Sequence, residues 1–422
     1  MKILLYSLCI VSVSFVLLTS CATLPVGQEI QEPVSDIGMF YAEHGFSSYE
    51  STVPITYIDG GEWTTRVLEL IEQAKDYILI DLFLANVSPI NQEIYDALRK
   101  KHDEGVRIYY LFDASSYIQP YPERNGFTPA AAPYLRSVGI SATDYNPYML
   151  VRLPILTGLL DRDHRKCWVF DGETLVLGGI NLNYTSFCKP KGKGHLDSMT
   201  EIVSRGAVTE VVNSFIKTWN AYSVETLYRK DFSIKDNAPA DSAIWLFEQG
   251  LGDHDVVDSM FSGLFSAAEH DVWMIQSFAF MDEKELRQIQ ELEERGVNVH
   301  IIYSENYMAA QYEKAAKYTM IKLLDTGADA YMYDSPDGTF SHMKFVGIDD
   351  SAVCFGSANY NFRSFELSRE LSFVSTDTRY IQDTWKWVHK VQELCRPVTR
   401  EEAERYRSPS YLFYYLIMFL GG

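Results

Sequence analysis

Cysteine is scarce in this chain, with 6 residues among 422. These cysteines do not show the paired spacing of a metal site, and the histidines do not form a His-x3-His pair. We therefore expect no metal centre. Cys167 and Cys354 lie in apolar, strand-like runs, which predicts that they are buried. Cys188 and Cys395 can pair only in an oxidising compartment, and spacing alone leaves this open.

Positive charge is also scarce, since 37 lysines and arginines stand against 57 aspartates and glutamates. The formal net charge of −20 repels polyanions at long range, which argues against a general nucleic-acid-binding protein. A local basic funnel can still form around Arg162, Arg165, Lys189, Lys191 and Lys193. Hydrophobic residues make up 47% of the chain, enough for the cores of two ordinary domains or one large pseudo-symmetric domain.

The amino-terminal end carries a long apolar run from Ile3 to Leu18, directly after Lys2. This layout is typical of a secretory signal, which we place at residues 1–20. The run ends Leu18-Thr19-Ser20-Cys21, which resembles the bacterial lipobox, where cleavage precedes a diacylated cysteine. We expect lipidation of Cys21, a tether over residues 21–50, and an exported bacterial lipoprotein anchored to a membrane facing the periplasm or cell surface. An uncleaved transmembrane anchor and an ordinary secretory signal are the alternatives.

The carboxy-terminal tail, residues 408–422, contains an apolar and aromatic run from Tyr411 to Leu420. This run is too short to cross a bilayer. Two interpretations stay open: a strand or helix docked into the core, and an interfacial contact with a membrane.

Between these ends, the same order of predicted elements occurs twice. Each half begins with two pairs of an amphipathic helix followed by an apolar strand, with strands predicted at 77–84, 106–112, 272–280 and 297–303. The segments DEGVRIYYLF and EERGVNVHIIY show the clearest similarity between the halves. Alternating strands and helices predict an α/β fold with a helix-covered sheet in each of two domains, residues 51–232 and 233–407.

A sparse pattern of reactive side chains also occurs twice, as H-x-K-x4-D-x6-G-(G/S)-x-N. The first copy contains His164, Lys166, Asp171 and Asn181, and the second contains His342, Lys344, Asp349, Ser357 and Asn359. At roughly one chance in twenty per fixed residue, five fixed positions recur by accident about once in a few million windows. Two accidental copies in one chain are therefore not a credible explanation.

These residue types suit reactions at a phosphodiester, which is anionic and resists attack. Two histidines can act as nucleophile and leaving-group acid, while two lysines and two asparagine amides hold the phosphate oxygens. Histidine and lysine stand two apart in each copy, so they share one face of a strand. His195 is ambiguous, because it lies near the basic loop but outside the repeat.

The two motifs resemble the HKD motifs of the phospholipase D superfamily, and the resemblance extends from about Gly60 to Arg396. The surrounding stretches, with Gly178-Gly179 in the first copy and Asn359, Asn361, Arg363 and Ser364 in the second, resemble bacterial cardiolipin synthases. The resemblance implies two pseudo-twofold-related phospholipase D-type domains, each a mixed β-sheet flanked by helices. It also implies one active site at their interface and no metal or organic cofactor.

The same resemblance assigns roles to residues. It gives catalytic roles to His164, Lys166, Asp171, His342, Lys344 and Asp349, with His164 as the nucleophile that forms a phosphohistidine and His342 as the acid and base. It has Asn181, Asn359 and Ser357 bind phosphate. It has Glu370, and Glu201 in the first half, orient the catalytic histidines, because a carboxylate at Nδ1 fixes the tautomer of an imidazole.

We therefore predict a phosphatidyltransferase that acts on glycerophospholipids at a membrane surface, with no nucleic-acid partner. A hydrolase using the same residues with water as acceptor is the closest alternative. A nuclease-type phosphodiesterase is third, and a non-catalytic binding lipoprotein that keeps the fold is the remaining one.

Overall fold

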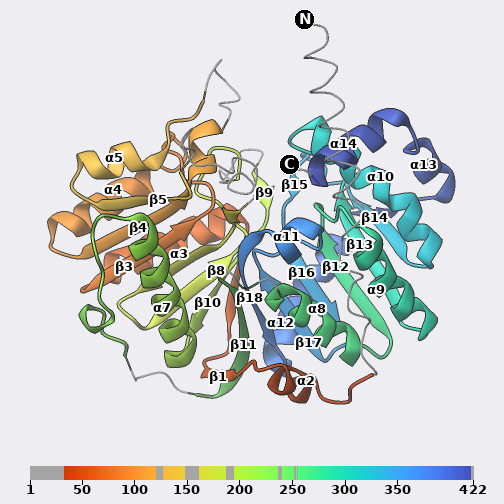
Figure 1. Ribbon diagram of the computed structural model, residues 1–422, viewed down its shortest axis with the longest axis horizontal. Coiled ribbons are helices and arrows are strands. Elements are labelled where there is room, and N and C mark those ends of the chain that lie inside the picture. Colours follow the sequence, from red (N-terminus) through yellow and green to blue (C-terminus); the bar gives the residue numbers. More distant parts are fainter. Residues whose placement is uncertain are drawn as a thin grey trace, which may run out of the picture.

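A computed structural model gives the structure of the protein and describes residues 33–119, 127–147, 161–186, 194–235, 240–250, 253 and 255–419. The signal sequence, Cys21, the start of the tether and Cys188 lie outside these residues, so the expectations about them stay predictions. The described chain forms two α/β halves side by side, each with a central sheet and helices outside it (Figure 1).

The first half is built on a seven-stranded mixed sheet in the order β2-β10-β8-β7-β3-β4-β5. Its strands are β2 (Ile55–Ile58), β3 (Tyr77–Leu82), β4 (Arg107–Asp113), β5 (Ser141–Tyr145), β7 (Lys166–Phe170), β8 (Thr174–Gly178) and β10 (Ser198–Val203). Its helices are α3 (Asp59–Gln73), α4 (Gln92–Asp103), α5 (Ala131–Ser137) and α7 (Arg205–Tyr222), with the short 3-10 turns η1 (Ala114–Ile118) and η2 (Arg229–Asp231).

The second half repeats this plan in a larger sheet, in the order β1-β11-β18-β17-β16-β12-β13-β14-β19. Its strands are β1 (Ser48–Ser51), β11 (Ser242–Gln249), β12 (Asp271–Gln276), β13 (Asn298–Ser304), β14 (Asp329–Tyr333), β16 (Lys344–Ile348), β17 (Ala352–Gly356), β18 (Ser368–Ser375) and β19 (Cys395–Pro397). Its helices are α2 (Ile37–Glu43), α8 (Val256–Ala267), α9 (Glu283–Glu294), α10 (Ala310–Thr326), α11 (Phe362–Glu366), α12 (Thr378–Gln392), α13 (Arg400–Arg405) and α14 (Pro409–Phe419).

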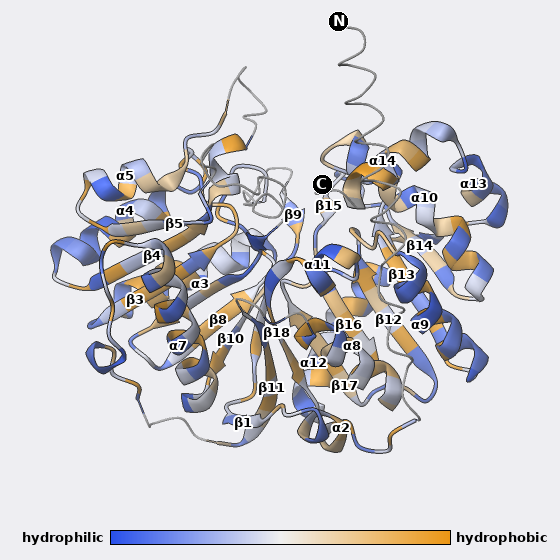
Figure 2. Cartoon of the chain, in the orientation of Figure 1, coloured by the Kyte–Doolittle hydropathy of each residue, from blue (hydrophilic) through white to orange (hydrophobic). Residues whose placement is uncertain are grey.

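The sequence explains these elements locally. Strands such as β3 and β16 are buried along their whole length, because helices or the other sheet cover both faces, and they accordingly read as apolar runs (Figure 2). Some helices begin at side-chain caps: Asp282 and Glu285 form a capping box at α9, and Ser204 caps α7. The predicted α/β class, with a helix-flanked mixed sheet in each half, is confirmed.

The expected tether over residues 21–50 is wrong at its carboxy-terminal end. α2 packs on α8, where the Tyr41 hydroxyl donates to the Met260 carbonyl at 2.9 Å, and β1 pairs antiparallel with β11. Phe40 and Tyr41 are buried, so this short segment contributes to the core of the second half although it precedes the first. An isolated seven-residue helix and a four-residue strand give too little periodicity to be recognised in a sequence.

Two short strand pairs join the halves beside the motifs. β6 (Arg162–Asp163) of the first half pairs with β18 of the second, and β9 (His195–Leu196) of the first pairs with β15 (Phe340–Ser341) of the second. Between the sheets lies a shared core that includes Leu79 and Leu177 from one half and Phe345 and Phe373 from the other. The ends of both motif strands therefore meet at one place in the molecule.

The apolar tail forms α14, which packs along α10. The interpretation of the tail as a helix docked onto the protein is therefore realised in part. Tyr415 and Met418 are buried, and the Tyr415 hydroxyl donates to the Met281 carbonyl. None of the described helices combines the length and the apolar composition needed to span a bilayer.

Candidate active site

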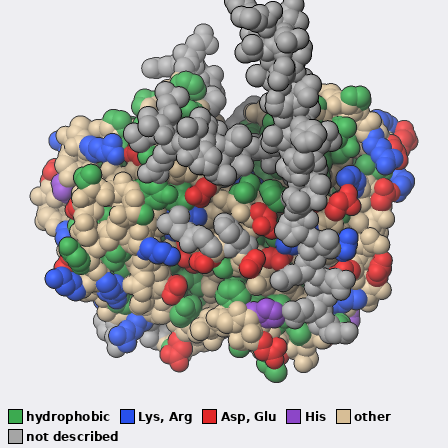
Figure 3. Space-filling view, in the orientation of Figure 1, with side chains coloured by type: hydrophobic (Ala, Val, Ile, Leu, Met, Phe, Trp, Pro, Cys, Tyr) green, Lys and Arg blue, Asp and Glu red, His purple; other side chains and the backbone are tan. Residues whose placement is uncertain are grey.

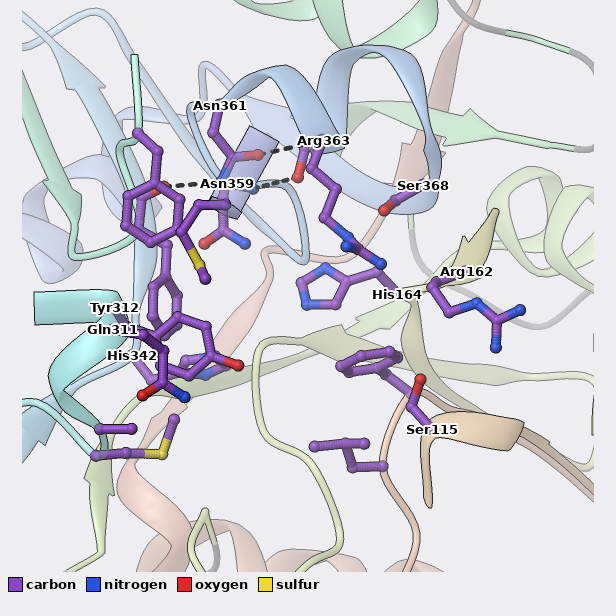
Figure 4. A pocket seen from close by; sticks show the side chains of 18 of the residues that line it. Ser115, Arg162, His164, Gln311, Tyr312, His342, Asn359, Asn361, Arg363 and Ser368 are labelled. Carbon is purple, nitrogen blue, oxygen red and sulfur yellow. Dashed lines mark hydrogen bonds between the residues drawn. The ribbon is translucent and has the colours of Figure 1, made fainter. Parts of the chain in front are cut away.

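His164 and His342 occupy matching positions where the halves meet. The backbone N–H of His164 donates to the Arg369 carbonyl on β18 at 3.0 Å, and that of His342 donates to the Leu196 carbonyl on β9 at 2.8 Å. Each histidine is thus held at its backbone by the opposite half. Both side chains line one cavity, which they approach from different sides (Figure 4).

A carboxylate from the opposite half holds the Nδ1 atom of each imidazole. Glu370 lies 3.1 Å from His164 Nδ1, as the sequence interpretation placed it. Asp197, which the sequence interpretation did not select, lies 2.6 Å from His342 Nδ1. Each carboxylate directly follows the residue that receives the backbone hydrogen bond of its histidine, so Asp197 and Glu370 are equivalent in the two halves.

The expectation that Glu201 orients a histidine is wrong. Its carboxylate forms an ion pair with Arg66 of α3 and accepts from the Tyr57 hydroxyl at 3.0 Å. Glu201 lies four residues beyond Asp197 along β10, which is about 13 Å at roughly 3.3 Å per strand residue. It therefore fastens α3 to the sheet at a distance from the imidazoles.

The difference between Gly-Gly and Gly-Ser in the two motifs follows from these carboxylates. Asp197 packs so tightly on Gly179 that a Cβ there would lie 2.1 Å from Asp197 Oδ1. In the second half the equivalent Ser357 donates its hydroxyl to Glu370 and accepts from the Leu371 N–H. Ser357 is fully buried and does not line the cavity, so its expected role in phosphate binding is corrected to holding Glu370.

The two motif lysines lie behind the histidines rather than on the cavity surface. Lys166 and Lys344 each donate their ammonium to the backbone carbonyl of the motif histidine two residues earlier. Their ammonium groups also stand over the rings of Phe83 and Phe278, at 5.1 and 5.7 Å from the ring centres. The two ammonium groups lie close enough to the imidazoles to help lower the pKa of His164 and of His342.

The two motif asparagines do line the cavity. The oxygen of Asn181 accepts from the Leu84 N–H at 3.1 Å, which leaves its NH2 group as a donor for a ligand. Asn359 Oδ1 is buried without a hydrogen-bond partner among the described residues. A buried amide with open bonding capacity in a cavity wall is suited to a polar ligand.

The motif aspartates lie at the other end of the motif strands, so the structure does not support the catalytic role expected for them. Asp171 accepts from the backbone N–H groups of Lys75, Asp76 and Tyr77, at 2.8–3.0 Å. Asp349 accepts in the same way from Glu269, His270 and Asp271. Both adopt a left-handed backbone, with φ of 51° and 48°, and both tie a hairpin turn to the start of the neighbouring strand.

Burial sets the charge state of the reacting groups. It lowers the pKa of His164 to about 4, against the opposing effect of Glu370, and lowers the pKa of His342 well below its usual value. Burial likewise lowers the pKa of Lys166 to about 7 and of Lys344 to about 8. An anion in the cavity counteracts this desolvation, and so raises the pKa of all four groups when it binds.

The pKa values of the two carboxylates, Glu370 and Asp197, shift in opposite directions. Burial would raise the pKa of Glu370, but His164 and Lys166 outweigh it and hold that pKa below the usual value. Burial raises the pKa of Asp197 to about 6, with Lys344 opposing. At pH 7 both carboxylates are ionised and both imidazoles are neutral, with Nδ1–H donating to the carboxylate and Nε2 free of a proton.

The cavity has a volume of about 760 Å³ and two kinds of wall. Around His164 lie the polar and cationic side chains of Arg162, Arg363, Ser115 and Ser368 (Figure 4). Apolar side chains also line the cavity: Leu84, Phe278, Phe280, Met308, Ile417 and Met418. No cluster of metal ligands occurs among the described residues.

This geometry agrees with the comparison with known families. A family model described as "Cardiolipin synthase, PLD-like domain" matches residues 67–219 and 262–391, which contain both motifs. The chain belongs to this family of phospholipase D-like domains. The motif resemblance and the two-domain phospholipase D fold are thereby confirmed.

Curated relatives in this family share about a quarter of their residues with the chain. Cardiolipin synthase 1 of Bacillus cereus is 26% identical over 343 residues, covering 77% of this chain and 63% of the relative. A cardiolipin synthase of Geobacillus kaustophilus is 23% identical over 354 residues, covering 81% and 66%. The chain thus spans slightly less than two thirds of the length of these relatives.

Solved structures share the fold of this phospholipase D-like protein. Phosphatidylserine synthase of Haemophilus influenzae superposes with a TM-score of 0.68 at 15% identity, covering 92% of this chain and 97% of that one. Polyphosphate kinase of Porphyromonas gingivalis reaches 0.53 at 10% identity, covering 92% and 56%. At these identities the likeness concerns the fold alone.

The phospholipase D-like site also contains residues to which the sequence pattern assigned no definite role. Besides Asp197, these are Arg162 and Arg363 in the cavity wall and His195, whose ring centre lies 5.5 Å from that of His342. Burial lowers the pKa of His195 to about 3, so it is neutral beside His342. The sequence contains only weak signals for them: Arg162 belongs to the predicted basic funnel, His195 lies near the basic loop, and Arg363 follows the second motif at a fixed offset.

Proposed function

We propose that the protein transfers a phosphatidyl group between glycerophospholipids, as a cardiolipin synthase does, through a phosphohistidine on His164. One observation carries this proposal. Two neutral imidazoles, each bonded at Nδ1 to a carboxylate of the opposite half and backed by a lysine, line a single cavity. That arrangement suits two successive displacements at one phosphorus atom.

In the first displacement, His164 Nε2 attacks the phosphorus of the donor lipid and the bond from phosphorus to the headgroup oxygen breaks. Glu370 stabilises the positive charge that develops on His164. The leaving oxygen takes a proton from His342, whose pKa rises in the complex because the bound phosphate is anionic. Lys166, Lys344 and the two asparagine amides stabilise the charge on the non-bridging oxygens.

In the second displacement, His342 Nε2 removes the proton from an acceptor hydroxyl, and the acceptor oxygen attacks phosphorus. The bond between phosphorus and His164 breaks, so both histidines return to their starting state. Asp197 stabilises the imidazolium of His342 in both displacements. The two steps therefore balance without any other co-reactant.

The cationic wall favours a phospholipid acceptor over water. The guanidinium of Arg363 points toward His164, with Arg162 on the same side of the cavity (Figure 4). Burial lowers the pKa of Arg363 and the charge of Arg162 acts in the same direction, while Asp113, which pairs with Arg162 at 3.2 Å, opposes them. Two guanidinium groups thus face one carboxylate, so a second anion there is stabilising. A phospholipid acceptor brings a second phosphate, whereas water brings none. A hydrolase using water is the second candidate, and it leaves this wall without a role.

The surroundings favour lipid over nucleic acid. On the face shown in Figure 3, Lys and Arg side chains are dispersed among Asp and Glu rather than gathered into a stripe. Together with the net charge of −20, this does not attract a polyanion. We further propose that the protein is an exported lipoprotein held at a membrane through Cys21, which would keep it near its substrate.

Expression of the full chain in a bacterial host that lacks its own cardiolipin synthases tests the proposal. We expect new cardiolipin in the extracted lipids, lost at least a thousandfold with His164→Ala and unchanged with His389→Ala, an exposed histidine on α12. Phosphatidic acid without cardiolipin would establish the hydrolase instead. Arg363→Gln separates the two activities further: transfer should fall at least tenfold more than release of phosphatidic acid.

A further inference from the structure

The surface of α14 that faces away from α10 is apolar. Leu412, Phe413, Leu416 and Ile417 are all exposed, Phe413 to 58% and Leu416 to 50%. They stand at positions i, i+1, i+4 and i+5, which form one face of a helix. The helix carries no charged residue from Pro409 to Phe419, and Figure 2 shows it near the carboxy-terminal end of the chain.

This apolar face continues into the mouth of the active-site cavity. Ile417 belongs both to the exposed face and to the cavity wall, where Tyr414 and Met418 of the same helix join it. Met308 and Ile118 also line the cavity while remaining exposed, and Ile118 comes from the first half. Exposed apolar side chains from both halves thus rim the opening. We call this set, Ile118, Met308, Leu412, Phe413, Leu416 and Ile417, the apolar rim.

An exposed apolar helix face is unfavourable in water at roughly 25 cal/mol for each Å². Because this apolar face lies at the mouth of the cavity, the ligand of the cavity indicates which partner covers it. A glycerophospholipid whose phosphate reaches His164 must keep its acyl chains outside the polar part of the cavity, in contact with apolar surface. Ile417 and Met418 of α14 line the cavity together with Met308, so the acyl chains of such a lipid meet apolar side chains at the rim.

We infer that the apolar rim inserts into the interfacial layer of a phospholipid bilayer and opens the cavity directly toward the lipids. α14 is the membrane-docking helix, lying in the plane of the interface without crossing it. Lys314 stands 5.0 Å over the Tyr414 ring and donates to the Ser410 hydroxyl, so it places a positive charge beside the lipid phosphates. The inference rests on the proposed function for its occupant, a phospholipid, and its first test does not require turnover.

Fluorescence quenching by brominated lipids measures the docking directly. In the full chain, Leu416→Trp places an indole in the rim, and vesicles with brominated acyl chains should quench the added fluorescence by at least a third. Met39→Trp is the matched control, because Met39 is 60% exposed on α2 at the opposite end of the molecule (Figure 1). Equal quenching at the two positions, or none at position 416, would overturn the inference.

Turnover on two physical forms of substrate provides the second test. Phe413→Asp combined with Leu416→Asp should lower turnover of phosphatidylglycerol vesicles at least tenfold, and leave turnover of a monomeric short-chain phosphatidylglycerol within twofold. Both side chains are exposed, so these changes spare the core. Equal turnover of vesicles by variant and wild type would refute the docking role.

A second copy of the chain covering α14 would also refute the inference. In that case the wild type would sediment as a dimer that the double substitution dissociates. If the wild type turned over neither form of phosphatidylglycerol, the proposed function would fail, while the quenching result would still decide whether the rim enters a bilayer.

Discussion

Asp197 and Glu370 are the residues that orient two buried histidines toward one cavity. Each carboxylate accepts from Nδ1, so each imidazole presents its Nε2 atom to the cavity. Without that bond a neutral imidazole can adopt the other tautomer and lose its lone pair at Nε2. Asp197 holds its histidine through one oxygen, Oδ2, whereas both oxygens of Glu370 lie 3.1 Å from His164 Nδ1.

Asp197→Asn should therefore lower kcat by about a hundredfold to ten-thousandfold while leaving the fold intact. Glu201→Gln is the matched control, because Glu201 is the acidic residue that sequence spacing selects but that binds Arg66 instead. We expect Glu201→Gln to keep kcat within about threefold of wild type. Steady-state kinetics on lipid vesicles and circular dichroism measure the two quantities. Equal losses in both variants would contradict the assignment.

The sequence predicted Glu370 but not Asp197, for a physical reason. Glu370 follows Asn359 after a compact turn around α11, so its offset from the motif is short. Asp197 follows Asn181 after a longer connection that contains the basic loop of Lys189, Lys191 and Lys193. The number of residues between a motif and a second residue predicts their distance only where the backbone between them has regular geometry. The pairing of β9 with β15 fixes Asp197, and no local pattern reveals that pairing.

At the scale of elements, the motif aspartates hold the turn of one hairpin against the strand beside it. Asp171 satisfies three backbone N–H groups at the start of β3, and Asp349 does the same at the start of β12. Hydrogen bonds to a charged acceptor contribute about 1.5–3 kcal/mol each. The motif aspartate thus stabilises the strand that positions the histidine and lysine.

Asp171→Ala should lower the free energy of unfolding by about 3 kcal/mol or more, because it leaves these N–H groups without an acceptor. Urea denaturation measures this change. Activity per folded molecule, assayed well below the unfolding midpoint, should stay within about threefold of wild type. A loss of turnover without a loss of stability would show that Asp171 acts in the chemistry.

The repeated helix–strand units were predictable because long apolar strands and helical periodicity are strong local signals. β3, β4, β12 and β13 overlap the strands predicted at 77–84, 106–112, 272–280 and 297–303, and helices α3, α4, α8 and α9 precede them in the predicted order. The strands β6, β9 and β15 have two residues each, which is too short to show the alternation of apolar and polar residues that identifies a strand. These short strands nevertheless decide how the halves meet.

At the scale of the whole molecule, a buried ionic network joins the halves beside the active site. Arg165 binds Asp81, Asp163 and Glu248, and Arg369 of the second half binds Asp163 at 2.7 Å. Three carboxylates here share two guanidinium groups. Burial, together with the charges of Asp163 and Glu248 and against that of Arg165, raises the pKa of Asp81 to about 8.

This network should make stability depend on pH in a defined direction. The pKa of Asp81 in the folded state lies above that of an unfolded aspartate, about 4, so the folded state binds more protons between these values. The stability that Asp81 contributes is present below pH 4 and is lost as the pH rises toward 8. Asp81→Asn keeps an acceptor for Arg165 without this titration.

The Tm of Asp81→Asn relative to wild type should accordingly increase from pH 5 to pH 8. Differential scanning calorimetry at each pH measures the difference, with Asp96→Asn on the exposed face of α4 as control. A constant difference across the range would show that Asp81 is ionised throughout. We expect one unfolding transition for the whole chain, because the core between the sheets belongs to both halves.

The exchange of β6 and β9 between the halves has a consequence for how such a chain is made. Each imidazole is hydrogen-bonded to an acid of the other repeat, so neither repeat alone contains a complete histidine–carboxylate pair. Under the proposed function, a chain that ends after the first repeat is therefore expected to be inactive. Covalent fusion of the repeats guarantees a one-to-one ratio of the parts, and it lets the two acids differ, aspartate in one place and glutamate in the other, without mismatched partners.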